Sequence, residues 1–238
     1  MNGLRDAFGY FTIVPVGDVD APDARALVWL PLVGAVVGAV AGGAAYGVAR
    51  VAPPALALAV AFALPILLTG ALHVDGFLDG CDAFFASVPA ARRLEILRDP
   101  RHGTYALAGG AIAAAFWIAA VSCIAPARLA LALACAGASA RLGAISLARF
   151  VPYGRAGEPA PALRGRPSII GLTIGLVFVL CVGAAMGVRG VTIVPAALAF
   201  AVLAGLFARR QLGGGLTGDA YGFSIVVAEV AGLVAFAV

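Results

Sequence analysis

The sequence has little charge and contains no lysine. Only 12% of its 238 residues are charged and 63% are hydrophobic, whereas a soluble domain is about 25% charged and roughly 45–50% apolar. This imbalance excludes an ordinary soluble protein and indicates that lipid surrounds most of the chain. The net charge of +4 comes from arginine. A basic excess in a membrane protein belongs mainly to cytoplasmic loops, so we expect no nucleic-acid partner.

Cysteine is also scarce, and its spacing excludes two kinds of site. The four cysteines are scattered and form no Cys-x-x-Cys pair, which argues against a disulfide framework or a zinc site. The chain shows no internal repeat and carries no hydrophilic domain. We therefore expect residues 1–238 to form a single membrane-embedded domain.

Long apolar stretches dominate what is present. Seven of them are near the length needed to cross about 30 Å of hydrocarbon, and they predict an all-α, polytopic membrane helix bundle of about seven transmembrane helices. The stretches lie at 28–49, 54–72, 105–125, 127–149, 168–188, 191–208 and 221–238. If the N-terminus is cytoplasmic, 12 of the 16 arginines fall in cytoplasmic segments. The positive-inside rule therefore favours a cytoplasmic N-terminus.

Three aspartates stand close together after the second stretch. Asp75, Asp79 and Asp82 are spaced so that a helix would place their carboxylates within roughly 60° of one face. Carboxylates this close repel one another unless a positive charge lies among them. A hard divalent cation such as Mg²⁺ prefers oxygen ligands, so the pattern predicts a magnesium site. A solvated helix face is the alternative interpretation.

Two further residues are candidates for the same site. Asp219 follows a glycine-rich turn, which presents backbone N–H groups as phosphate-binding loops do; it is either a fourth metal ligand or a helix N-cap. Arg141 lies inside an apolar stretch, and a buried guanidinium requires an anion. The anion is either a substrate phosphate or the carboxylate of Glu229.

The segment before the third stretch combines acid, base and proline. Pro100 disfavours helical backbone at Asp99, so Asp99, Arg101 and His102 should lie in a turn after an amphipathic helix. Such a turn could bind phosphate or metal. His73, beside the three aspartates, is the other histidine of the chain.

Several segments resemble the cobalamin synthase family, the adenosylcobinamide-GDP ribazoletransferases, in the same order and spacing. The segments are FTIVPVG (11–17), LHVDGFLDGCDAF (72–84), LEILRDPRHGTY (94–105), RFVPYGRAGEP (149–159) and LGGGLTGDAYGFSIVVAEV (212–230). Small departures occur, such as Pro100 where the family usually has serine. The departures leave the acidic residues intact.

The resemblance implies a Mg²⁺-dependent enzyme of the bacterial inner membrane with its site facing the cytoplasm. The family transfers the cobinamide-phosphate moiety of adenosylcobinamide-GDP to α-ribazole or its 5′-phosphate and releases GMP. The expected partners are these substrates and the bilayer, and a homo-oligomer is left open. We assign Asp99, Arg101 and His73 to catalysis; Arg141, Thr217, Arg155 and His102 to substrate binding; and Asp75, Asp79, Asp82 and Asp219 to the metal.

Two other functions are compatible with a membrane protein that has clustered aspartates. A CDP-alcohol phosphotransferase-type lipid enzyme also uses such a cluster, but its usual Ala-Arg pair and later aspartate pair are missing here. A transporter would explain Arg141 and Glu229 as an ion path. It would leave the three-aspartate face and the glycine-rich turn without a role.

Overall fold

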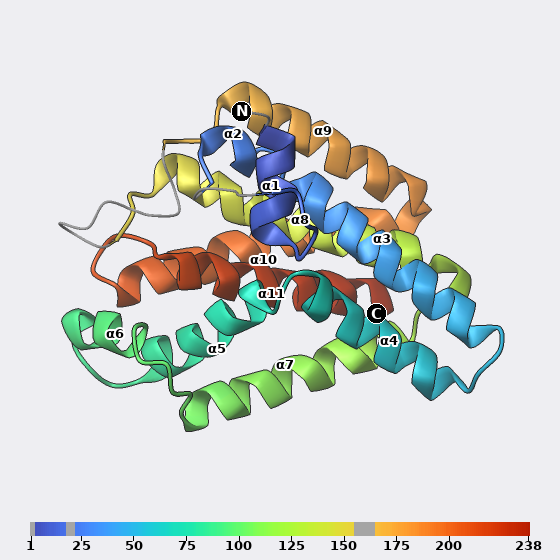
Figure 1. Ribbon diagram of the computed structural model, residues 1–238, viewed down its shortest axis with the longest axis horizontal. Coiled ribbons are helices and arrows are strands. Elements are labelled where there is room, and N and C mark those ends of the chain that lie inside the picture. The colour runs from blue at the N-terminus through green and yellow to red at the C-terminus, as the bar shows by residue number, and fades with distance from the viewer. Residues whose placement is uncertain (1–2, 18–21, 155–164) are drawn as a thin grey trace.

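A computed structural model describes residues 3–17, 22–154 and 165–238, and this part of the chain is almost entirely helical (Figure 1). It contains no strand in these ranges, and an isolated bridge joins Tyr153 to Leu216. The α-helices are α1 (Gly3–Phe11), α2 (Ala24–Leu27), α3 (Leu30–Ala49), α4 (Pro54–Leu68), α5 (Leu72–Phe85), α6 (Ala90–Ile96), α7 (Thr104–Ser122), α8 (Leu129–Phe150), α9 (Ile169–Ala185), α10 (Gly190–Gln211) and α11 (Gly218–Ala237). Short 3-10 helices, η1 (Pro126–Arg128) and η2 (Gly187–Arg189), precede α8 and α10.

Each predicted apolar stretch corresponds to a helix, and the polytopic helix bundle is confirmed. Among the described residues, α3, α7, α8, α10 and α11 are long and apolar enough to cross a membrane, the 3-10 turns being counted with α8 and α10. The pair α4–α5 adds a sixth span if it is taken as one, and α9 is apolar but has only 17 residues. The predicted number of seven spans and the cytoplasmic N-terminus therefore stay predictions.

The second apolar stretch ends earlier than the sequence predicts. The chain leaves α4 through Gly70 and Ala71, both with left-handed backbone (φ 57° and 60°), and α5 is bent by 89° from α4. With 14 residues, α5 is about 21 Å long and too short to span the hydrocarbon core. We treat α5 as a helix outside the membrane-spanning segments.

Helix α8 lies at the centre of the bundle and contacts α3, α9, α10 and α11. Its sequence is rich in alanine and glycine. These small side chains let neighbouring backbones approach closely, and such close packing holds helices together in lipid, where no hydrophobic effect drives them to associate. Gly34, Gly38 and Gly42 of α3 lie directly against the backbone of α8, where an added Cβ would collide with it. These glycines recur at every fourth residue, the small-residue spacing that lets two helices pack closely in lipid.

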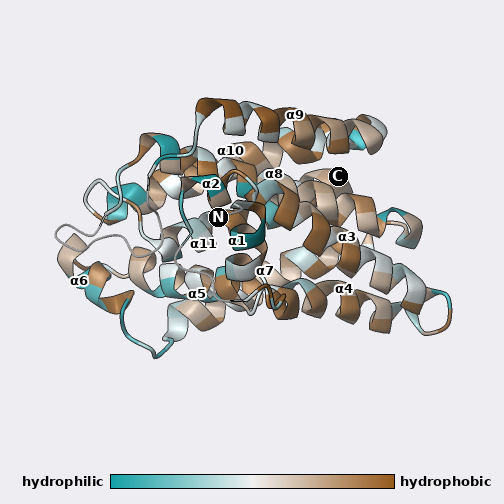
Figure 2. Ribbon diagram, turned by 45° about the horizontal axis from the view of Figure 1, so that its top comes forward, coloured by the Kyte–Doolittle hydropathy of each residue, from teal (hydrophilic) through white to brown (hydrophobic). Residues whose placement is uncertain are grey.

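Polar connections gather at one end of the bundle. In Figures 1 and 2, α6 and the turn between α10 and α11 lie at the same end, opposite the α3–α4 connection. The segment after α8 is tied to that turn, because the Gly154 N–H donates to the Leu216 carbonyl at 2.8 Å and the Leu216 N–H to the Pro152 carbonyl at 3.0 Å. This end therefore brings together three of the motifs that carry polar residues.

Candidate active site

Two carboxylates of α5 lie on one face of the helix and differ in exposure. The side chain of Asp75 is 64% exposed and that of Asp79 is 16% exposed. His102, from the loop before α7, lies beside both: its Nδ1 is 3.4 Å from Oδ1 of Asp79 and its Nε2 is 3.9 Å from Oδ1 of Asp75. The structure thus brings together three residues that the sequence predicts for one site.

A close approach of α5 and α11 adds a third carboxylate. A Cβ on Gly76 would lie 3.0 Å from the Cα of Asp219, and a Cβ on Gly222 would lie 3.1 Å from the Cα of Gly76. Glycine at both positions allows the two backbones to meet this closely. As a result, Asp219 in the first turn of α11 lies near the carboxylates of α5.

Thr217 fixes the start of α11 and the orientation of Asp219. Its buried hydroxyl accepts a hydrogen bond from the Ala220 N–H at 3.3 Å and donates to Oδ2 of Asp219 at 3.2 Å. Thr217 is therefore the N-cap of this helix, and Asp219 is not. The assignment of Thr217 to substrate binding stays a prediction.

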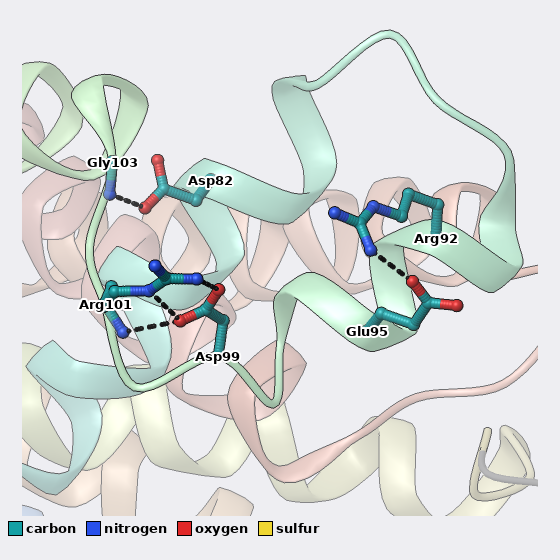
Figure 3. Close-up of polar contacts among 6 residues, drawn as sticks. All are labelled: Asp82, Arg92, Glu95, Asp99, Arg101 and Gly103. Atoms are coloured by element: carbon teal, nitrogen blue, oxygen red, sulfur yellow. Dashed lines mark hydrogen bonds and ion pairs between the residues drawn. The ribbon is translucent and has the colours of Figure 1, made fainter.

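Asp82 connects α5 to the start of α7. Its Oδ2 accepts a hydrogen bond from the Gly103 N–H at 2.5 Å (Figure 3), and its Oδ1 accepts one from the Ala106 N–H at 2.9 Å. Both donors are backbone groups at the helix N-terminus, where they have no partner within the helix. A carboxylate has about four lone-pair sites, so Asp82 can cap α7 and still offer oxygen to a cation.

Without a cation, the site holds several carboxylates close together with little positive charge among them. Burial raises the pKa of Asp79 to about 6, and the negative charges of Asp75 and Asp219 add to this effect. In the described part of the chain, no three His, Cys, Asp or Glu side chains converge as a bound metal requires. The donor set nevertheless fits a hard divalent cation, because it consists of carboxylate oxygens whose repulsion a positive charge would relieve.

A cavity of about 190 Å³ adjoins the carboxylates of Asp75 and Asp219, with walls from α1, α2, α3, α5, α8 and α11. Asp75, Asp219, His73, Phe11 and Tyr221 are among the residues that line it. The ring of Phe11 stacks on the imidazole of His73, with 6.3 Å between the ring centres. Burial, followed by the positive charge of Arg141, lowers the pKa of His73 well below its usual value. The imidazole is therefore neutral.

The structure pairs two of the predicted catalytic residues with each other. Nε and Nη2 of Arg101 donate to the two carboxylate oxygens of Asp99 at 2.9 and 2.8 Å (Figure 3). The Arg101 side chain is 86% exposed. Hydrogen bonds from Arg101 lower the pKa of Asp99 to about 2, so this carboxylate is ionised. Both residues lie on the loop that carries His102.

Arg141 is buried in the bundle and contacts a carboxylate of the protein. Its Nη1 lies 3.4 Å from Oε2 of Glu229 and donates to the Gly137 carbonyl at 3.0 Å. The pair with Glu229 is the structural alternative that the sequence left open, and the assignment of Arg141 to a phosphate stays a prediction. Arg155, also predicted to bind substrate, lies outside the described residues.

Sequence reasoning missed the two glycines that assemble the site. Gly76 and Gly80 in α5, like Gly218 and Gly222 in α11, are four residues apart, which is the small-residue spacing typical of close helix contacts. The glycines of α3 have the same spacing and lie against α8. This spacing could have indicated the contact between α5 and α11 as well.

The fold and the site together define a class of protein: a polytopic membrane protein with an acidic cavity beside a polar end of its helix bundle. Comparison of the sequence with known families then identifies the particular one. Residues 3–237 match the model of the family described as cobalamin-5-phosphate synthase, and the chain belongs to this family.

Individual relatives agree with the family match. The chain is 36% identical to an adenosylcobinamide-GDP ribazoletransferase of Bradyrhizobium diazoefficiens, with 92% of this chain and 86% of the relative covered. It is 33% identical to proteins of the same name from Deinococcus radiodurans, covering 96% and 83% of the two chains, and Geobacillus kaustophilus, covering 93% and 89%. No solved structure matches the chain.

Proposed function

We propose that this protein is an adenosylcobinamide-GDP ribazoletransferase of the bacterial inner membrane. It joins the cobinamide-phosphate moiety of adenosylcobinamide-GDP to α-ribazole, or to its 5′-phosphate, and releases GMP. The observation that carries this proposal is that Asp75 and Asp219 line one cavity and act electrostatically on the neighbouring Asp79, in a chain that matches the family over residues 3–237.

The carboxylates of α5 and α11 would hold Mg²⁺. Asp79 is the central ligand in this proposal because Asp75, Asp82 and Asp219 all act on its carboxyl group electrostatically. When bound, Mg²⁺ would neutralise charge on the diphosphate and on the departing GMP. His102 lies beside Asp75 and Asp79, where its ring can donate a hydrogen bond to a phosphate oxygen.

The reaction is a substitution at the phosphorus bonded through oxygen to cobinamide. A ribazole hydroxyl forms the new P–O bond, the bond to the GMP oxygen breaks, and the hydroxyl proton passes to a carboxylate. We assign this proton to Asp99. In the free protein, Arg101 holds the pKa of Asp99 at about 2, which makes Asp99 a weak base.

Arg101 links substrate binding to the strength of that base. Its guanidinium is exposed, and a phosphate is a matched partner for the planar fork. When Arg101 turns from Asp99 to the substrate diphosphate, the Asp99 carboxylate loses the hydrogen bonds that lower its pKa. Its basicity then rises at the moment when the ribazole hydroxyl is present.

The polar end of the bundle faces the cytoplasm in this proposal. Most arginines belong to connections that the positive-inside rule places in the cytoplasm, and nucleotides are found in that compartment. Single-cysteine variants in a background without the native cysteines would test the orientation with a membrane-impermeant thiol reagent. Residue 102 should be labelled only from the cytoplasmic side, and labelling of intact cells at that position would refute it.

Turnover by the purified protein tests the function. Protein in lipid vesicles with adenosylcobinamide-GDP, α-ribazole and Mg²⁺ should release GMP and form adenosylcobalamin, and a chelator should stop the reaction. Asp79→Asn should lower the rate at least about 100-fold, because a metal ligand loses its charge. Glu95→Gln is the matched control, since Glu95 is exposed on α6 and pairs with Arg92 (Figure 3).

The two parts of the proposal fail in different ways. If wild-type protein releases no GMP from these substrates, the assigned reaction is wrong. If GMP is released equally well by Asp79→Asn and in the presence of chelator, the reaction stands and the metal site is wrong.

A further inference from the structure

A second cavity lies deeper in the bundle, behind the carboxylate cavity. It has a volume of about 110 Å³ and is lined by residues of α4, α5, α7, α8 and α11. Most of its wall is apolar, and its polar residues are Thr69, His73, Arg141 and Glu229. The proposed reaction gives this cavity no role.

Two buried nitrogen atoms of residues that line the cavity have no hydrogen-bond partner. They are Nε2 of His73 and Nε of Arg141, on side chains that are 7% and 3% exposed. A buried polar group without a partner has lost its hydrogen bonds to water and gained none in return, so a molecule that supplies a partner is favoured here. An acyl chain of a lipid cannot supply one, because it has no polar atom at this depth.

The rest of the wall suits a flat aromatic ring. Phe62 and Trp117 meet edge to face, with their ring centres 5.2 Å apart, and Phe77 also lines the cavity. Aromatic walls favour planar apolar ligands through stacked and edge contacts. The ligand should therefore be a small aromatic ring system with few polar atoms.

His73 joins this cavity to the carboxylate cavity. Among the described residues that line the two cavities, His73 of α5 and Ile225 of α11 are the two that belong to both. A ligand whose aromatic part lies in the deep cavity can therefore extend a polar part past His73 toward Asp75 and Asp219. The arrangement fits a nucleoside with an unusually apolar base.

On the basis of the proposed function, we propose that the deep cavity binds the dimethylbenzimidazole base of α-ribazole. The two methyl groups and the fused ring would contact Phe62 and Trp117. The unsubstituted ring nitrogen is a hydrogen-bond acceptor, and Nε–H of Arg141 is a donor without a partner. The ribose then projects past His73 into the carboxylate cavity, where its hydroxyl reacts.

Equilibrium binding of labelled α-ribazole, measured without corrinoid, tests this proposal independently of turnover. Ala114 of α7 lines the deep cavity, and Ala114→Phe would fill it. Ala115→Phe is the matched control, because the neighbouring Ala115 is exposed and lines neither cavity. Ala114→Val is a milder replacement for use if the larger side chain prevents folding.

We expect Ala114→Phe to weaken α-ribazole binding by roughly 10-fold or more, with Ala115→Phe within about 2-fold of wild type. Free dimethylbenzimidazole should displace labelled α-ribazole, and ribose 5-phosphate should not. In turnover, the KM for α-ribazole should rise while the KM for adenosylcobinamide-GDP is unchanged.

Equal α-ribazole binding by folded Ala114→Phe and by wild type would overturn the proposal, as would displacement by ribose 5-phosphate alone. The result of this binding test is independent of the result of the turnover test for the proposed function. GMP release with binding that is insensitive to residue 114 refutes only the base site. Binding that depends on residue 114 without GMP release refutes only the reaction.

Discussion

The contact between α5 and α11 can be tested with a single methyl group. An ideal Cβ on Gly76 would lie 3.0 Å from the Cα of Asp219 and 3.2 Å from its carbonyl oxygen. Ordinary van der Waals contact begins at 3.4 Å, so Gly76→Ala is short by 0.4 Å at the nearest backbone atom. Backbone atoms cannot rotate away, and the two helices must separate by a few tenths of an ångström.

The expected consequences follow from this displacement. Overpacking a well-packed contact costs about 1–3 kcal/mol, so the protein should still fold with a lowered Tm. Moving a catalytic group by about 1 Å can cost roughly 100-fold in rate. A smaller shift of Asp219 should therefore lower kcat/KM by about 10-fold or more. Gly76→Val, with two further methyl groups, should prevent folding or abolish turnover.

GMP release and thermal unfolding measure the two effects separately. Gly43→Ala is the control, because Gly43 is also helical and an added Cβ there meets nothing within 4 Å. This control should keep the wild-type rate and gain a little stability from the higher helix propensity of alanine. Wild-type turnover and Tm in Gly76→Ala would show that the two helices are not held this closely, and the reasoning would be wrong.

Three further predictions concern charge. Asp82→Asn should lose one of the two hydrogen bonds to the start of α7, because a carboxamide has a single acceptor oxygen where the carboxylate has two, and its Tm should fall. It should also lose turnover at least about 100-fold if Asp82 is a metal ligand, and an unchanged Tm would contradict the cap. The raised pKa of Asp79 means that the folded protein binds more protons than the unfolded chain between pH 4 and about 6. The Tm of metal-free protein should therefore rise as the pH falls through 6. The same Tm trend in Asp79→Asn would refute this cause. Glu229→Leu alone breaks the buried pair with Arg141 and should lower the free energy of unfolding by about 3–5 kcal/mol. The double variant Glu229→Leu with Arg141→Met should recover most of this loss. Chemical unfolding of both variants measures the difference.

The sequence predicts the helices well because their signal is local. A run of about 20 apolar residues identifies a helix in lipid whatever its neighbours are, and each of the seven predicted stretches corresponds to a helix. The position at which the second stretch ends is not determined by such a local signal. The residues up to Leu72 continue to be apolar, and only the left-handed backbone at Gly70 and Ala71 ends α4 and turns the chain.

The site shows the same division between local and distant information. By itself, the sequence determined the chemistry: carboxylates one turn apart on α5, a lipid-embedded chain, and motifs that resemble one family. Only the tertiary structure decided which partners these groups have. Asp82 caps α7, and Arg141 contacts Glu229 across the bundle. Such pairings depend on how close two helices come, and that distance is set by small residues far apart in the chain.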